Sequence, residues 1–211
     1  MTPLLLVVAA YLLGATPTSF WVGRAISGKD LRREGSGNLG ATNALRVLGW
    51  KAALPVLVVD LAKGWAPVAL FPLIDGSSAS WLALIYGAAT IMGHVYSFWV
   101  GFRGGKGVAT SAGVFLALAP WALLAAFAVW LAAVMTSRMV SLGSILAAIV
   151  LPLAVYLTPH AGGEWTLVFS TVLAVFVLWA HRANMGRIRR GEENRFGRSG
   201  SPRSERVPDP E

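Results

Sequence analysis

Hydrophobic residues run along most of the chain in long blocks that polar residues interrupt at only a few places. A helix needs about 20 apolar residues to cross a ~30 Å hydrocarbon layer, and six blocks reach or approach that length. They cover residues 3–23, 53–73, 80–100, 107–136, 141–158 and 164–181. The pattern predicts an all-α integral membrane protein. We expect the first block to be a retained helix rather than a signal peptide, because no positive residue precedes it.

The fourth block, residues 107–136, is too long for one upright crossing. At 1.5 Å per residue it would form a helix of about 45 Å, and Pro120 lies near its middle. A turn at Pro120 would give two short helices of about 22 Å each, which the bilayer can accommodate by thinning. The alternative is a single long, tilted helix.

Dividing the fourth block gives seven crossings and places every loop Lys and Arg on one side of the membrane. These basic segments are residues 24–51, 103–106, 138 and 182–211. Six crossings would place Arg138 and the basic C-terminal region on the opposite side from residues 24–51. Positive residues concentrate in cytoplasmic loops, so the sequence predicts seven transmembrane helices with the N-terminus outside and the C-terminus cytoplasmic.

Composition supports a membrane protein and narrows its chemistry. The chain has 211 residues, of which 55% are hydrophobic and only 13% charged, about half the charged share of a typical soluble domain. The absence of cysteine excludes thiolate chemistry and disulfides. The net charge of +8 is explained by the cytoplasmic loops, so we expect no nucleic-acid partner. We expect one seven-helix domain over residues 1–190 and a basic, disordered cytoplasmic tail over 191–211, lying against anionic membrane lipids.

Three polar clusters break the apolar pattern, and the predicted topology places all of them on the cytoplasmic face. The first is GSGNLGATN at 35–43, followed by Arg46. Its glycines allow positive φ and close approach to a ligand, and their N–H groups can converge on an anion. Arg46 can bind phosphate with its guanidinium fork. The alternative is a flexible turn between helices.

The second cluster, RGGKG at 103–107, precedes an apolar helix. A helix N-terminus carries partial positive charge and suits phosphate. The cluster is not a Walker A loop, because Gly107 and Val108 follow Lys106 where Ser or Thr should follow directly. A basic loop that anchors the protein to lipid is the alternative.

The third cluster surrounds His181 and Asn184, which share one helical face at a spacing of i, i+3. The alternative is a basic stretch that only sets topology. Asp60 and Lys63, within the second block, have the same spacing. They either pair with each other or leave Lys63 to add positive charge to the site. We interpret His94 as a packing residue.

The sequence contains no clustered carboxylates that could hold Mg²⁺ and no serine nucleophile elbow. The candidate site is therefore rich in cations and neutral hydrogen-bonding groups, which suits anionic substrates and predicts no metal and no cofactor.

These motifs resemble those of the bacterial acyl-phosphate:glycerol-3-phosphate acyltransferases. The matching segments are GSGNLGATN at 35–43, DLAKG at 60–64, GHVYSFWVGFRGGKGVAT at 93–110, SLG at 141–143 and HRANMGRI at 181–188. Leu39 departs from the Pro that members often have. The resemblance implies a multi-pass enzyme of the bacterial inner membrane with a cytoplasmic active site. It implies transfer of a fatty acyl group from acyl phosphate to the 1-hydroxyl of glycerol 3-phosphate, giving 1-acyl-glycerol 3-phosphate and phosphate.

The motifs and the resemblance together give a candidate site. The predicted catalytic residues are Ser36, Arg46, Lys106, His181 and Asn184. The predicted substrate-binding residues are Gly37, Asn38, Thr42, Asn43, Lys63, Arg103, Gly104, Gly105, Gly107 and Ser141.

Acyl phosphate is an activated anhydride, so direct transfer needs neither an acyl-enzyme nor a metal. The proton acceptor is either His181 or the leaving phosphate, and the acyl tail should lie among apolar helices. Contact with a soluble enzyme that produces acyl phosphate is a further expectation. The competing function is an anion carrier, which the one-sided placement of the polar clusters disfavours.

Overall fold

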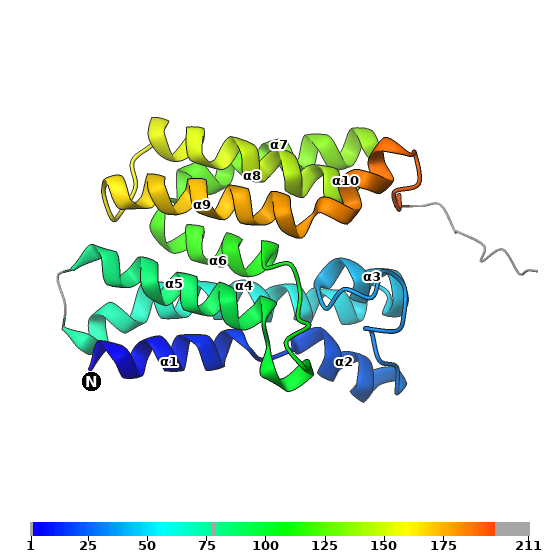
Figure 1. Cartoon of the computed structure of the whole chain (residues 1–211), viewed down its shortest axis with the longest axis horizontal. Coiled ribbons are helices and arrows are strands. Elements are labelled where there is room, and N and C mark those ends of the chain that lie inside the picture. The colour runs from blue at the N-terminus through cyan, green and yellow to red at the C-terminus, as the bar shows by residue number, and fades with distance from the viewer. Residues whose placement is uncertain (1, 77–78, 197–211) are drawn as a thin grey trace, which may run out of the picture.

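The computed structural model describes residues 2–76 and 79–196, and it is built from helices (Figure 1). The α-helices are α1 (Pro3–Gly14), α2 (Thr18–Ser27), α3 (Ala41–Leu48), α4 (Trp50–Asp75), α5 (Ser80–Val95), α6 (Val108–Leu118), α7 (Pro120–Ser137), α8 (Val140–Leu157), α9 (Glu164–Ala180) and α10 (Arg182–Arg189). A short 3₁₀ helix, η1, covers Phe98–Val100.

The long helices form two layers with α6 between them (Figure 1). One layer holds α1, α4 and α5, and the other holds α7, α8 and α9. The main hydrophobic core surrounds α6, where Val114 and Phe115 pack against Leu151 and Leu173. Large apolar side chains cover the outer faces as well, including Leu73, Met135 and Tyr156. A surface this apolar suits lipid rather than water.

Glycines let α6 approach α4 very closely. A Cβ atom on Gly64 of α4 would lie 2.0 Å from the Thr110 carbonyl oxygen, and a Cβ on Gly113 of α6 would lie 2.0 Å from the Leu61 carbonyl oxygen. Small residues at such contacts are typical of helices that pack within a membrane. The contact fixes α6 and therefore the loop that precedes it.

The membrane protein predicted from the sequence is confirmed, while the number of crossings is only partly supported. Within the described residues, five helical segments are long and apolar enough to cross a membrane, and a sixth is formed if α9 and α10, bent by 57°, count as one. The break at Pro120 is confirmed, since α6 ends at Leu118 and α7 begins at Pro120. Proline is favourable at a first helical position, where no N–H is required.

The two helices flanking Pro120 are unequal, which corrects our expectation of two short ones. Helix α6 has 11 residues, whereas α7 has 18 and is long enough to cross alone. Seven crossings, with α6 as the seventh, therefore stay a prediction.

Three further features differ from the sequence interpretation. The first block is divided, because α1 ends at Gly14 and α2 starts at Thr18 after Pro17. The loop after α2 contains helix α3, which we did not predict. Residues 191–196, expected in the tail, are placed against the domain, whereas 197–211 lie outside the described residues.

Candidate active site

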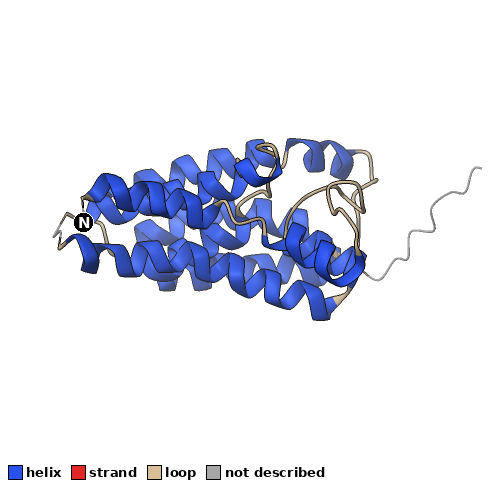
Figure 2. Ribbon diagram, turned by 90° about the horizontal axis from the view of Figure 1, so that it is seen from below, coloured by secondary structure: helices blue, strands red, loops and turns tan. Residues whose placement is uncertain are grey.

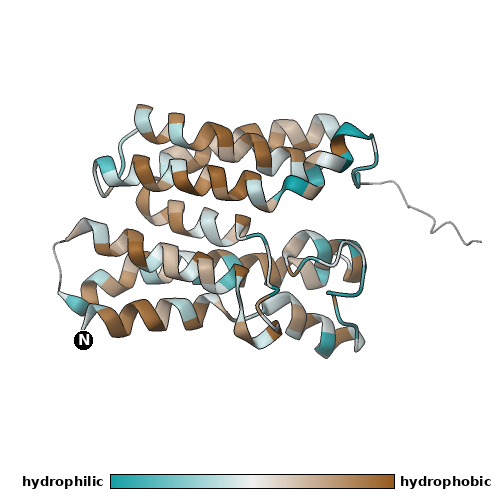
Figure 3. Cartoon of the chain, in the orientation of Figure 1, coloured by the Kyte–Doolittle hydropathy of each residue, from teal (hydrophilic) through white to brown (hydrophobic). Residues whose placement is uncertain are grey.

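A cavity of about 1590 Å³ opens at the end of the bundle where α3, α10 and the loop before α6 meet. The loops that surround it gather at the end of the bundle away from the N-terminus (Figure 2), and hydrophilic residues gather at the same end (Figure 3). The cavity exceeds the 300–1,000 Å³ typical of a small-ligand site. Predicted site residues that line it are Ser36, Gly37, Asn38, Thr42, Asn43, Arg46, Arg103, Gly104, Lys106, Gly107, Ser141, His181 and Asn184. Lys63 and Gly105 do not line it.

The loop before α3 is held in shape by the buried side chain of Asn43. Its Oδ1 accepts a hydrogen bond from the Ser36 N–H at 2.8 Å, and its Nδ2 donates to the carbonyl oxygens of Leu31 at 3.1 Å and Glu34 at 3.0 Å. Both amide hydrogens are therefore used within the loop. This differs from the substrate-binding role that we expected for Asn43.

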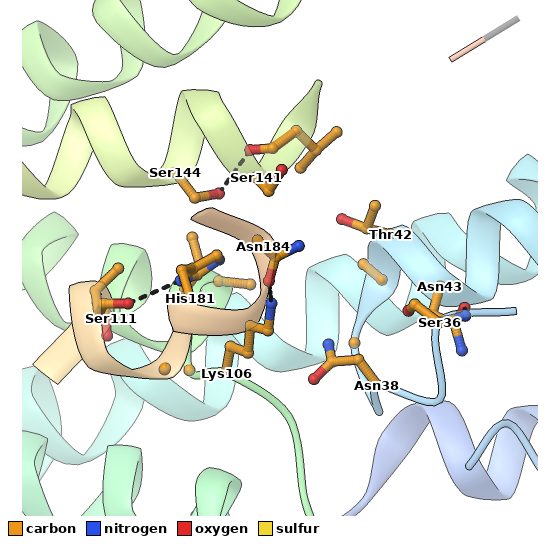
Figure 4. A pocket seen from close by; sticks show the side chains of 18 of the residues that line it. Ser36, Asn38, Thr42, Asn43, Lys106, Ser111, Ser141, Ser144, His181 and Asn184 are labelled. Atoms are coloured by element: carbon orange, nitrogen blue, oxygen red, sulfur yellow. Dashed lines mark hydrogen bonds between the residues drawn. The ribbon is translucent and has the colours of Figure 1, made fainter. Parts of the chain in front are cut away.

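Helix α3 presents Thr42 and Arg46 to the cavity from one face, because they are four residues apart. The opposite face is apolar, and Ala44 packs into a buried cluster with Val56 of α4. Amphipathic packing on α4 thus explains why this short segment is helical. It places Thr42 on the side of the cavity that faces Asn184 of α10 (Figure 4), and Arg46 lines the same cavity.

The loop before α6 lies directly on the C-terminal end of α5. The Gly104 N–H donates to the Val95 carbonyl oxygen at 2.9 Å, and the Gly105 N–H donates to the His94 carbonyl oxygen at 3.2 Å. These bonds satisfy carbonyl groups that the end of α5 leaves unpaired. The two N–H groups therefore do not face the cavity, which corrects our expectation that they bind phosphate. Gly107 follows with φ +77° and is the residue immediately before α6.

Lys106 reaches from this loop to α10, where its Nζ donates to Asn184 Oδ1 (Figure 4). The side chain is half-buried at the centre of the polar end of the cavity. Burial lowers the Lys106 pKa to about 8, and the negative charge of Glu193 opposes that shift. The ammonium group is thus the predominant form at pH 7.

His181 and Asn184 lie where α9 bends into α10, and both are buried. The bend turns them toward Lys106 at the cavity wall (Figure 4), as their spacing predicted. His181 Nδ1 lies 2.9 Å from the Val177 carbonyl oxygen. Because a carbonyl only accepts, Nδ1 carries the proton and Nε2 is the acceptor nitrogen.

Glu193 belongs to the polar end of the cavity, although the sequence analysis placed it in the tail. Its Oε1 accepts from Ser141 Oγ at 2.8 Å and from Asn184 Nδ2 at 2.7 Å, and its Oε2 accepts from Arg187 Nε at 2.7 Å. Burial acts to raise the Glu193 pKa, but these hydrogen bonds outweigh it and hold the pKa below its usual value. Ser141, expected to bind substrate, thus uses its hydroxyl hydrogen on Glu193. No spacing in the sequence indicated this contact.

Lys63 does not line the cavity, although its partner Asp60 does, and it is paired inside the bundle. Its Nζ lies 2.8 Å from Asp60 Oδ1 and donates to the Thr16 carbonyl oxygen at 2.9 Å. That carbonyl lies at the break between α1 and α2, so Lys63 satisfies a helix end. The substrate-binding role expected for Lys63 is not supported, and the pairing alternative is correct. His94 packs against Gly105 and also lines the cavity, so the packing role that we expected stays a prediction.

The comparisons with known proteins agree with these motifs. The sequence model of the family described as "Glycerol-3-phosphate acyltransferase" matches residues 4–191. A glycerol-3-phosphate acyltransferase from Chlorobaculum tepidum is 40% identical, and the match covers 94% of this chain and 99% of the relative. One from Listeria monocytogenes serovar 1/2a is 45% identical, covering 90% and 94%.

Two solved structures are also similar to the chain, and both are described as PlsY (YgiH), an integral membrane glycerol 3-phosphate acyltransferase. The glycerol 3-phosphate form has a TM-score of 0.85 at 38% identity and covers 92% of this chain and 96% of that one. The lysophosphatidic acid form has a TM-score of 0.79 at 37% identity, covering 92% and 95%. The chain therefore belongs to the glycerol-3-phosphate acyltransferase family of integral membrane enzymes.

Proposed function

We propose that this enzyme transfers a fatty acyl group from acyl phosphate to the 1-hydroxyl of glycerol 3-phosphate, giving 1-acyl-glycerol 3-phosphate and phosphate. One observation carries the proposal: a single cavity joins a cationic polar end to an apolar end among the membrane helices. The glycerol 3-phosphate and lysophosphatidic acid forms of the similar structure support the acceptor and the product. Phosphate release that requires both substrates is the direct test.

The apolar end of the cavity suits a fatty acyl chain. Helix α8 lines the cavity with one face, through Ser141, Ser144, Ala147, Ala148 and Leu151. From Ser141 to Leu151 that face spans about 15 Å at 1.5 Å per residue, roughly half of the hydrocarbon core. The acyl chain then extends toward the middle of the membrane while its carbonyl carbon stays near Lys106.

At the polar end the enzyme must place two anions that repel each other. Lys106 and Arg46 offset that repulsion, and Asn184 and Ser36 hydrogen-bond and orient the substrates. The glycerol 1-hydroxyl oxygen attacks the acyl carbonyl carbon, and the bond from that carbon to the phosphate oxygen breaks. Phosphate leaves with charge that Lys106 neutralises. The acyl donor is already activated, so the proposed transfer proceeds directly, without an acyl-enzyme, a metal or a cofactor.

The leaving phosphate is the proton acceptor that the geometry favours. A histidine base is usually oriented by a carboxylate on its other nitrogen, but His181 Nδ1 faces the Val177 carbonyl oxygen instead. His181 Nε2 then serves to orient glycerol 3-phosphate.

His181→Ala tests this assignment. We expect turnover within about tenfold of wild type and a raised KM for glycerol 3-phosphate, since the change removes binding rather than proton transfer. The measurement is steady-state phosphate release over a range of glycerol 3-phosphate, with His160→Ala, in the loop between α8 and α9, as control. A fall in kcat of roughly 10²–10⁴-fold with unchanged glycerol 3-phosphate binding is the loss expected of a general base, and it would assign that role to His181.

Ala148→Phe tests the position of the acyl chain. Ala148 is buried on the face of α8 that lines the apolar end. A phenyl ring there should lower kcat/KM for palmitoyl phosphate at least about tenfold, while octanoyl phosphate is affected less. Leu153→Phe, at an exposed position on the same helix, is the control. Equal effects on both chain lengths would place the acyl chain elsewhere.

We also propose that the cavity faces the cytoplasm and that the protein has seven crossings in a bacterial inner membrane, with the N-terminus outside. Basic residues that define the predicted cytoplasmic side include Arg24 in the last turn of α2, Lys51 in the first turn of α4 and Arg138 at the end of α7. These helix ends lie at the end of the bundle away from the N-terminus, which is the cavity end (Figure 1). The positive-inside rule supports this orientation.

A further inference from the structure

The segment that follows α10, residues 191–196, lines the cavity with residues 192–196, and we call it the strap. At its start the Glu192 N–H donates to the Arg187 carbonyl oxygen at 2.8 Å. At its end the Phe196 N–H donates to the carbonyl oxygen of Arg138, which follows α7, at 2.9 Å. The strap is thus tied to α10 and to the end of α7, and Figure 1 shows it in orange after α10.

The strap carries one buried acid into the polar end of the cavity. Only 5% of the Glu193 side chain is exposed, and its carboxylate receives hydrogen bonds from Ser141, Asn184 and Arg187. The neighbouring acid, Glu192, also lines the cavity, but 57% of its side chain is exposed and it pairs with Arg190. Burying a carboxylate is costly unless hydrogen bonds compensate for the lost water, and the three donors provide that compensation for Glu193.

The bond to Asn184 has a consequence for Lys106. Because the Asn184 Nδ2 donates to Glu193 Oε1, the amide is fixed with its Oδ1 turned toward Lys106, whose Nζ donates to it. An amide without that anchor could rotate and present donors to the ammonium group instead. Glu193 therefore determines which face of Asn184 the catalytic lysine meets.

We infer that Glu193 is a positioning residue for acyl transfer, fixing the Asn184 amide and balancing the charge of Arg187 so that Lys106 is held at the reacting centre. The inference rests on the proposed function of the same cavity. It goes beyond that function by assigning a role in the reaction to the strap.

The charges around Lys106 allow a positioning role of Glu193 to be distinguished from a purely structural one, because they change the pKa of Lys106. The charges that act on Lys106 are those of Glu193 from the strap and Arg187 from α10, and Lys106 in turn acts on His181 at the α9–α10 bend. Arg46 from α3 faces Glu193 and Arg187. Glu193 raises the Lys106 pKa and Arg187 lowers it. Removing Glu193 should thus let Lys106 lose its proton at a lower pH, and removing Arg187 should do the reverse.

The test compares Glu193→Gln with Glu164→Gln, which changes an exposed acid at the start of α9 that does not line the cavity. It uses the full-length protein and pH profiles of kcat/KM for phosphate release from palmitoyl phosphate and glycerol 3-phosphate. For wild type we expect activity to fall as pH rises through about 8, where Lys106 loses its proton. Glu193→Gln should lower kcat at least about tenfold, the order of effect of one charge-assisted hydrogen bond. It should also move the alkaline fall to lower pH, whereas Glu164→Gln should match wild type in both respects.

Arg187→Met is a second test, and it does not depend on whether Glu193→Gln folds. This variant should move the loss of activity at alkaline pH to a higher pH. Thermal melting and gel filtration report the folded fraction of each variant. The inference is overturned if folded Glu193→Gln keeps the wild-type kcat and pH profile. It is also overturned if Arg187→Met leaves the alkaline fall in place or moves it to lower pH. Loss of activity in wild type itself would instead reject the proposed function.

Discussion

Replacing Lys106 with alanine is expected to lower phosphate release from palmitoyl phosphate and glycerol 3-phosphate by about 10²–10³-fold. Removing one preorganised donor at a developing negative charge costs this much in other acyl-transfer enzymes. Lys106 is the donor at the developing negative charge in this protein, because its half-buried ammonium group contacts Asn184 at the centre of the polar end of the cavity. The measurement is kcat under saturating substrates.

Lys51→Ala is the matched control, because Lys51 is exposed near the start of α4 and does not line the cavity. It should keep wild-type kcat. If Lys106→Ala stayed within a few-fold of wild type while Lys51→Ala did the same, phosphate neutralisation would have to be assigned to another cation.

Replacing Gly104 with alanine is expected to cost about 100-fold in kcat/KM although the residue supplies no side chain to the reaction. A Cβ at Gly104 would lie 2.0 Å from the His94 carbonyl oxygen, so the loop must move away from α5. A displacement of about 1 Å in a group that positions substrate can cost 10²-fold. Lys106, two residues further along, would be displaced with the loop.

Gly186→Ala is the control for this change, since it lies within α10 and its added Cβ would meet only the end of the Arg190 side chain, at 3.4 Å. Thermal melting separates a displaced loop from an unfolded protein, and we expect Gly104→Ala to be recovered folded. Wild-type kcat/KM in folded Gly104→Ala would show that the close approach to α5 does not set the position of Lys106.

The helices could be predicted from the sequence wherever their bounds depend on nearby residues alone. Block length and Pro120 together predicted the break between α6 and α7. The break between α1 and α2 was missed because a residue far away in the sequence stabilises it. Lys63 donates a hydrogen bond to the Thr16 carbonyl oxygen, which lies at the break. Helix α3 was missed because eight residues between glycines are too short to form a helix without tertiary packing.

The residues that make up the site could be predicted from the sequence, but the hydrogen bonds between them could not. The motifs pointed to Lys106, His181 and Asn184, which the structure brings together. The sequence could not show that the glycine N–H groups near Lys106 face α5, because only the packing of the loop decides their direction. Nor could it indicate Glu193, whose contacts depend on a strap that turns back after α10.

The most direct test of the proposed function is phosphate release by the purified full-length protein in detergent or lipid, with palmitoyl phosphate and glycerol 3-phosphate, in the presence of EDTA and without coenzyme A. We predict release that requires both substrates, yields 1-acyl-glycerol 3-phosphate and is unaffected by EDTA. Folded protein that binds glycerol 3-phosphate but releases no phosphate would contradict the proposed acyl transfer and make anion transport the function to test.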